Sequence, residues 1–271
     1  MSRTLREVWL FFWRDLLIAS TYRTVFLLEA IEALFGAAMF FYVARFVDSP
    51  QLERALPQAG GYFAFSLVGF IFLDYLSISL DTFDRSLQQA RDSGTLEHLL
   101  VTQTSLPALL AGSAIYPLAA TTVRVAVYIA WGALLFHFPL GAANWPGVLV
   151  MLIATLLAFC GLGILSASYL LLVKRGNPAK WFLLGISSVT GGTLFPVSIL
   201  PDWLRFIARL NPVTYALDGM RTALLGNTGF SALYAPLAVL LGFAVVLLPC
   251  SMLAFSWALY RTKVNGTLTH S

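Results

Sequence analysis

Six long apolar blocks dominate this chain, and each is long enough to cross a lipid bilayer. A helix rises 1.5 Å per residue, so about 20 apolar residues cover the roughly 30 Å hydrocarbon layer. Backbone in lipid must satisfy its own hydrogen bonds, which favours helices here. The sequence therefore predicts an all-α polytopic membrane protein. The expected spans lie near 24–47, 60–83, 107–136, 147–173, 181–200 and 234–260.

The composition of the 271 residues excludes other classes. Hydrophobic residues make up 59% of the chain and charged residues only 11%, whereas a soluble domain carries about 25% charged residues. A soluble enzyme and a disordered chain are both incompatible with this balance. A transmembrane β-barrel would show short segments of alternating polarity, which the continuous apolar blocks do not resemble.

The N-terminal segment, residues 2–21, predicts an amphipathic helix in the membrane interface. Trp9 and Trp13 lie on its apolar side, and Arg14 lies on the opposite side. Interfacial helices place tryptophan at headgroup depth. Arg14 and Asp15 interrupt the apolar core that a secretory signal requires, so we do not expect cleavage.

Lysine and arginine predict the orientation. With the N-terminus inside, eleven of the 17 basic residues fall on the cytoplasmic side and five on the other. Cytoplasmic loops carry the excess of basic residues in membrane proteins. We therefore expect both termini in the cytoplasm and one transmembrane domain over 1–271 in the cell membrane. The net charge of +4 then reflects orientation, and we expect no nucleic-acid partner.

Two connections are predicted to be structured. Residues 84–106 indicate a polar helix, a break at Ser93 and Gly94, and a second short helix with Glu97 at its third position. Residues 200–231 are too polar to span the bilayer and too apolar for a free loop. Two short re-entrant helices on the outer side fit them best, since irregular backbone at membrane depth must be buried in protein or line a cavity.

The sequence lacks the common motifs for catalysis and nucleotide binding. No G-x-x-x-x-G-K-[ST], H-E-x-x-H, C-x-x-C or G-x-S-x-G pattern occurs. His98, His137 and His270 fall in three separate non-spanning segments. We therefore expect no catalytic residues, no metal site and no ATP site on this chain.

Ionisable residues inside the predicted spans are the remaining candidates. They are Glu29 and Glu32 in the first span, Asp74, Ser77 and Asp81 in the second, and Arg124 in the third. Charged groups at this depth cost about 2.5–3.5 kcal/mol each on insertion scales and rarely face lipid. We expect Arg124 to neutralise Glu29, Glu32 or Asp74, while Asp81 and Asp84 are hydrated near the cytoplasmic end. The alternative is a cation or proton relay.

Several motifs, in this order, resemble the permeases of type-2 ABC exporters. The start of the chain is similar to the polysaccharide-exporter branch. The matching stretches are Trp13-Arg14-Asp15 with Tyr22-Arg23, residues 94–102 (GTLEHLLVT), residues 195–201 (FPVSILP) with Trp203-Leu204, and residues 211–221 (NPVTYALDGMR).

The resemblance implies how these segments act. The short helix near 94–104 would be the coupling helix that docks on the ATPase, through Gly94, Thr95, Leu96, Glu97, Leu99 and Leu100. The interfacial helix would lie against the same partner. The re-entrant helices would carry the outer motif, which includes Asn211, Pro212, Tyr215, Asp218 and Arg221. From its position we expect Arg221 to form a surface pair with Asp218.

The resemblance also implies the assembly. Two such chains, most simply a homodimer, would associate with two copies of a separate ATP-binding subunit, which binds ATP and Mg²⁺. The function would be ATP-driven export of an amphipathic, lipid-linked or drug-like cargo. The alternatives are a gradient-driven secondary transporter or ion channel that uses the buried carboxylates, which the missing inverted repeat weakens, and a membrane-embedded enzyme, which no convergent polar cluster supports.

Overall fold

The computed structural model describes residues 9, 13–14, 16–17, 23–47, 56, 60–92, 106–141, 143–173, 177–226 and 229–264. Regular structure in these ranges is helical, without strands. The α-helices are α2 (Arg23–Val47), α4 (Gly61–Asp92), α6 (Leu106–Phe136), α7 (Trp145–Val173), α8 (Pro178–Thr190), α9 (Asp202–Arg209), α10 (Pro212–Leu225) and α11 (Tyr234–Val264). Two short 3₁₀ segments, Val197–Ile199 and Phe230–Leu233, precede α9 and α11.

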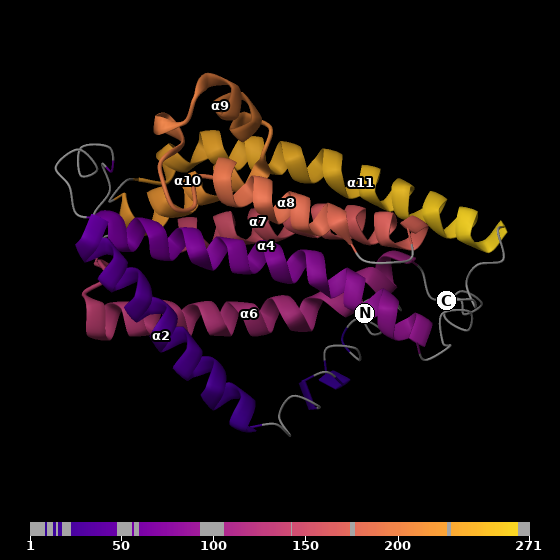
Figure 1. Ribbon diagram of the computed structural model, residues 1–271, viewed down its shortest axis with the longest axis horizontal. Helices are drawn as coiled ribbons and strands as arrows, with labels where there is room; N and C mark the ends of the chain where they lie inside the picture. Colours follow the sequence, from indigo (N-terminus) through magenta and orange to yellow (C-terminus); the bar gives the residue numbers. More distant parts are fainter. Residues whose placement is uncertain are drawn as a thin grey trace.

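Five segments of the described chain are long and apolar enough to cross a bilayer, and they confirm a multi-pass helical architecture. They are Leu27–Val47, Gly61–Gln88, Gly112–Phe136, Trp145–Val173 and Phe230–Thr262. Helices α4, α6, α7 and α11 follow the long axis of the molecule (Figure 1). Helix α2 runs obliquely away from them.

Helix α4 is the centre of the bundle. It packs against α2, α6, α7, α8 and α10. Its side chains Leu67, Tyr75, Leu76 and Leu80 are all 1% exposed or less and belong to the cores formed with these neighbours. Any displacement of α4 therefore acts on both the α2–α6 side and the α7–α8–α10 side of the bundle.

Helix α4 is longer than the predicted second span. The prediction separated a span at 60–83 from a polar helix at its end, but a single helix of 32 residues runs to Asp92. The polar residues near its end, such as Arg85 and Gln88, are exposed on one side while Leu87 stays buried. The amphipathic pattern therefore continues the helix beyond the apolar block. The predicted break and the coupling segment that follows lie outside the described residues.

The predicted fifth span at 181–200 was wrong in its length. Helix α8 begins at Pro178 and ends at Thr190, after 13 residues. At 1.5 Å per residue it is about 20 Å long, too short for the hydrocarbon layer. The chain then turns at Gly192, whose φ of 75° is a left-handed conformation that favours glycine. The apolar composition of 191–200 therefore does not continue the helix, and the segment is partly buried, with Leu194 and Ile199 exposed.

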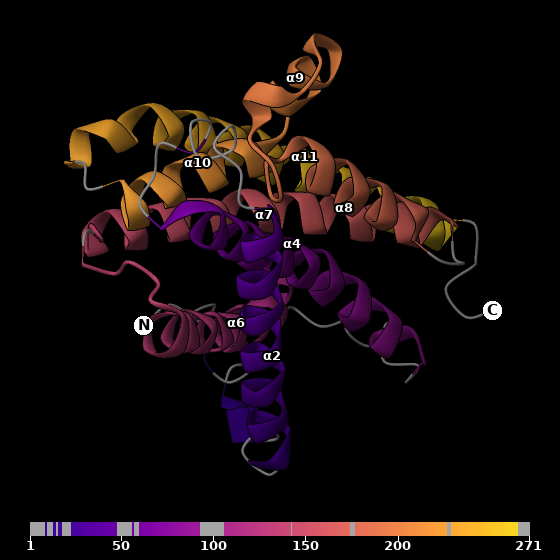
Figure 2. The ribbon, with the colours of Figure 1, turned by 60° about the vertical axis from the view of Figure 1, so that its left-hand side comes forward.

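Two short helices follow this turn, as the sequence predicted. Helix α10 lies along the bundle, whereas α9 projects from it (Figure 2). The charged side of α9 is exposed, and its Ala208 is fully buried. Their depth in a membrane remains a prediction. We call the end of the bundle that holds α9 and α10 the outer end, and the end that holds Asp92, Pro178 and Val264 the inner end (Figure 1).

Candidate functional site

The broken helix α8 is held at its outer end by the Asn211-Pro212 motif. Asn211 caps α10, because its Oδ1 accepts a hydrogen bond from the Val213 N–H at 3.0 Å, and Pro212 begins the helix. The Asn211 Nδ2 donates to Thr190 Oγ1 at 3.0 Å. The Thr214 hydroxyl donates to the Thr190 carbonyl at 3.3 Å. The motif therefore starts α10 and joins it to the last residue of α8.

Arg221 holds the turn after α8 against α4. It is 5% exposed, and its guanidinium donates to the carbonyl oxygens of Gly192 at 2.7 Å, Phe65 at 2.8 Å and Thr193 at 3.1 Å. The same group stacks on the Phe65 ring, 3.4 Å from its centroid. A Cβ on Gly69 would overlap the Thr193 carbonyl. The turn therefore needs both the donor groups of Arg221 and the small residue on α4.

The expected surface pair between Arg221 and Asp218 was wrong. Asp218 is exposed, while Arg221 is buried with carbonyl partners. The sequence spacing indicated a pair three residues apart, and the two charges do lie within electrostatic range of each other, but Arg221 is turned inward toward the carbonyl groups. Asp218, Tyr215 and Arg221 all line a cavity of about 330 Å³ beside the turn. The Tyr215 hydroxyl donates to the Arg209 carbonyl at 3.0 Å, which links α10 to the end of α9.

In the middle of the bundle, Arg124 of α6 contacts Asp74 of α4. The ion pair is 2.9 Å long, and the two side chains are 20% and 23% exposed. The next residue on α4, Tyr75, makes a second contact with α6, because its hydroxyl donates to Thr122 Oγ1 at 3.0 Å. Of the three acidic partners left open by the sequence, Asp74 is the one that touches Arg124.

The other two carboxylates lie nearby on α2. Glu29 is half-buried and Glu32 is exposed, and both are within electrostatic range of Asp74. Asp74 also lines a cavity of about 430 Å³ between α4 and α8, with Phe70, Ser77 and Trp181 among its other walls. The middle of the bundle thus presents an aromatic and polar surface on the side of α4 that faces α8.

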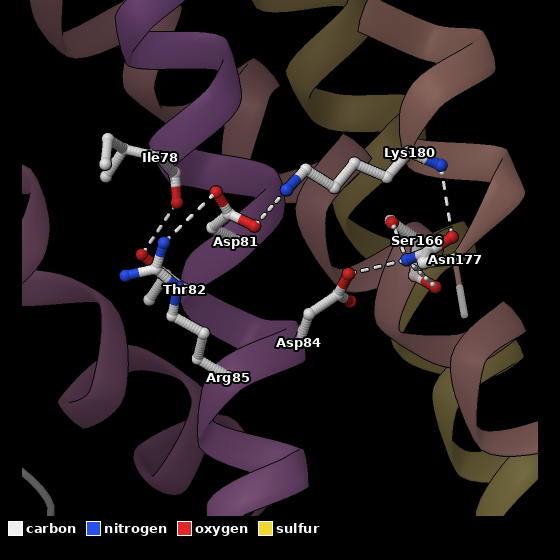
Figure 3. Close-up of polar contacts among 8 residues, drawn as sticks. All are labelled: Ile78, Asp81, Thr82, Asp84, Arg85, Ser166, Asn177 and Lys180. Carbon is white, nitrogen blue, oxygen red and sulfur yellow. Dashed lines mark hydrogen bonds and ion pairs between the residues drawn. The ribbon is translucent and has the colours of Figure 1, made fainter. Parts of the chain in front are cut away.

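A third polar group, which we call the inner cluster, joins α4, α7 and the start of α8. It comprises Asp81, Asp84, Ser166, Asn177 and Lys180 (Figure 3). The Lys180 ammonium pairs with Asp81, which also contacts Arg85 at 3.6 Å. The Asn177 Nδ2 donates to Asp84 Oδ2 and to Ser166 Oγ, both at 2.6 Å. Asn177 Oδ1 accepts from the Lys180 N–H at 3.0 Å and caps α8.

The expectation of hydration was wrong for Asp84, which is buried, while Asp81 keeps partial exposure. Asp84 is 4% exposed, and the Asp81 side chain is 17% exposed. Their position near the predicted cytoplasmic end suggested contact with water. Helix α8, however, begins at the same depth and packs over them. Asp74 and Asp81, both in the second predicted span, have different partners, since Asp74 pairs with Arg124 of α6 and Asp81 pairs with Lys180 of α8.

The sequence analysis missed Asn177 and the role of Lys180. Lys180 was counted only as an orientation signal, and Asn177 was not considered. The available signal was the dipeptide Asn177-Pro178, which repeats the Asn211-Pro212 pattern. Asparagine at the N-cap with proline at the first helical position is a strong helix start. One such pair begins α8, and the other begins α10 after the turn.

The structure describes only some of the remaining residues that the sequence singled out. Trp9 and Trp13 are 55% and 48% exposed, and their rings stack with centroids 6.1 Å apart. Asp15 lies outside the described residues. The six coupling residues at 94–100 lie outside them as well, so their role remains a prediction.

These features define the class of protein. It is a multi-pass helical membrane protein with a broken helix that buried polar groups anchor. Residues 6–225 match the family described as ABC-2 type transporter. The match covers most of the chain, which therefore belongs to the ABC-2 permease family, the transmembrane component of ABC transporters. Membership implies that the chain lies in the membrane and associates with an ABC ATPase subunit.

The chain is also similar to two bacterial proteins, and the name of one of them agrees with this assignment. The chain is 24% identical over 201 residues to the inner membrane transport permease YadH of Escherichia coli K12, covering 74% of this chain and 75% of that protein. It is 32% identical over 111 residues to the uncharacterized protein YhgE of Bacillus subtilis. That second match covers 40% of this chain and only 13% of YhgE.

The Arg124–Asp74 pair generates a stability prediction. Arg124→Leu leaves a partly buried carboxylate without its ion-pair partner. This costs about 3–5 kcal/mol of stability in soluble proteins, and less in a membrane, where the carboxylate finds other polar partners in the unfolded state. We expect a lower melting temperature and yield in detergent. Adding Asp74→Asn should recover part of the loss.

The matched control for this pair is Glu32→Gln, because Glu32 is exposed on α2 and does not touch Arg124. It should not rescue Arg124→Leu. A stable Arg124→Leu variant, whose transport instead changes its dependence on pH or sodium, would favour the relay interpretation.

The inner cluster generates a second prediction. Asn177→Asp keeps the cap on α8 but replaces the amide donor with a carboxylate that faces the Asp84 carboxylate, so the melting temperature should fall by several degrees. The double variant Asp84→Asn with Asn177→Asp reverses the amide and the carboxylate and should recover most of the loss. Thermal unfolding of the three proteins measures this, and a double variant no more stable than Asn177→Asp would contradict the direct contact.

Proposed function

We propose that this chain is the permease subunit of an ATP-driven exporter, in which movement of α8 opens and closes the translocation path. The observation that carries the proposal is the construction of α8: a helix too short to span, anchored at both ends by buried polar groups. Such a segment can be displaced as a unit when either anchor moves. The outer anchor and the short helices α9 and α10 would close the path on the outside.

The inner cluster supplies a mechanical route from the ATPase to α8. Helix α4 runs directly from Asp81 and Asp84 to Asp92, and the predicted coupling segment follows at 94–104. A push on that segment would move the end of α4. Because Asp81 binds Lys180 and Asp84 binds Asn177, α8 would follow.

We further propose a dimer with two ATP-binding subunits. The cavity beside Asp74 opens on one side of a single chain, which suits half of a shared path. Helix α2 supports a seam on that side, since Leu28, Ile31, Phe35 and Met39 are each 49–70% exposed. In this proposal, spans near α2, α4 and α8 line the seam.

The ATP and Mg²⁺ would be bound by the partner ATPase and not by this chain. The inner end of the bundle would face the cytoplasm, with both termini on that side, as the basic residues predict. The cell membrane is the proposed location, in agreement with the name of the E. coli relative.

The proposed cargo is amphipathic, lipid-linked or drug-like. Trp181 and Phe70 supply aromatic surface in the cavity beside α8, while Asp74 and Ser77 supply polar groups. Binding sites for small ligands combine apolar walls with a few polar groups in this way. A gradient-driven transporter is less well supported, because Arg124 already offsets the charge of Asp74.

The test is Leu96→Asp in the proposed coupling segment. A charge in a desolvated contact should cost a few kcal/mol of association, as at interface hot spots. We expect the variant to fold and dimerise but to lose the ATPase during copurification, or to lose cargo-stimulated ATP hydrolysis.

The matched control is His98→Asp, which places the same charge on the other side of a helix through Leu96. It should retain the ATPase. Normal ATPase association and transport by Leu96→Asp would refute the coupling assignment, and a single permease chain in the intact complex by native mass spectrometry would refute the dimer.

A further inference from the structure

A groove of about 360 Å³ lies near the inner end of the bundle, on a side separate from the cavity beside Asp74. Helices α7, α8 and α11 all contribute to its walls. The apolar side chains that line it include Leu165, Tyr169, Leu172, Phe182, Ala254 and Trp257.

The two serine hydroxyls of the groove already have hydrogen-bond partners. They belong to Ser166 and Ser168. Ser168 donates to the Ile164 carbonyl at 2.7 Å, and Ser166 accepts from Asn177 at 2.6 Å. A buried water needs two to four polar partners, so this groove suits an apolar occupant.

An extended hydrocarbon chain suits these walls, because it needs no polar partner along its length and the groove is lined mainly by apolar side chains.

A positive charge lies at the inner end of the groove. Arg261 is exposed one turn beyond Trp257 on α11, and its guanidinium carbon is 5.2 Å from the Trp257 ring centroid. In the sequence, Lys174 and Arg175 follow the last residue of α7. Tryptophan beside arginine is typical of the headgroup level of a membrane, and basic residues there attract anionic lipids.

We propose that the groove between α8 and α11 binds one acyl chain of an anionic membrane phospholipid, with the headgroup phosphate beside Arg261. The tail would cover Leu172 and Phe182 and fill the space beside Ala254. The lipid would then support the start of α8 beside the inner cluster, with which the groove shares Ser166. This site is distinct from the cargo path and does not depend on which cargo is exported.

The test is lipid retention by the purified full chain. The protein is equilibrated with equal amounts of phosphatidylglycerol and phosphatidylcholine, and bound lipid is counted by native mass spectrometry without the ATPase. We expect one retained phosphatidylglycerol per chain. Ala254→Trp fills the groove and should lower retention at least fivefold, while Arg261→Gln should remove the preference for phosphatidylglycerol.

The matched control is Leu253→Trp, which adds the same side chain one residue earlier at a position that is 72% exposed and does not line the groove. It should retain lipid as the unchanged protein does. Equal retention by the Ala254 and Leu253 variants would overturn the proposal. The unchanged protein could instead retain no lipid while Ala254→Trp changes the number of chains in the assembly. That result would identify the groove as a protein interface and overturn the proposal.

A second measurement avoids the risk that Ala254→Trp does not fold. The emission of Trp257 is obtained as the difference between the unchanged protein and Trp257→Phe. Phosphatidylglycerol brominated on its tails should quench this emission more strongly than brominated phosphatidylcholine. Equal quenching by the two lipids would contradict the anionic site.

Discussion

The buried guanidinium of Arg221 is the interaction on which the outer half of this fold depends. A helix that stops inside a membrane protein leaves backbone carbonyls without partners, and each is costly at low dielectric. Arg221 satisfies the carbonyls of Gly192 and Thr193 and at the same time binds Phe65 of α4. One side chain therefore satisfies the carbonyls of the turn that follows α8 and fixes this turn to the central helix.

The inner end of α8 uses the same principle with different groups. Asn177 caps the helix and binds Asp84 and Ser166, while Lys180 binds Asp81. Helix α8 is therefore specified by polar contacts at its two ends, and its middle is largely exposed on the side of Trp181. In the proposed function, this arrangement would position the short helix and also let it move when either anchor moves.

Much of the helical architecture could be predicted from hydropathy. The first, third, fourth and last spans agree with α2, α6, α7 and α11 within a few residues, because membrane helices are marked by long apolar runs. The end of α8 could not be predicted in this way, since 191–200 is apolar like a span but turns at Gly192, where Thr193 packs against Gly69 of α4. Arg221 was placed in its motif, but its partners are backbone carbonyls, which leave no trace in a sequence. Asp84 appeared hydrated because its cover, α8, begins 93 residues later near Asn177.

Hydrogen exchange in the turn after α8 tests the role of Arg221 most directly. Arg221→Met keeps the length and apolar stem of the side chain and removes its donors. If the guanidinium holds the turn, amides in 191–200 should exchange about tenfold faster in the variant, as local opening becomes easier, while α7 stays protected. Unchanged exchange across 191–200, in a variant that folds normally, would contradict the account.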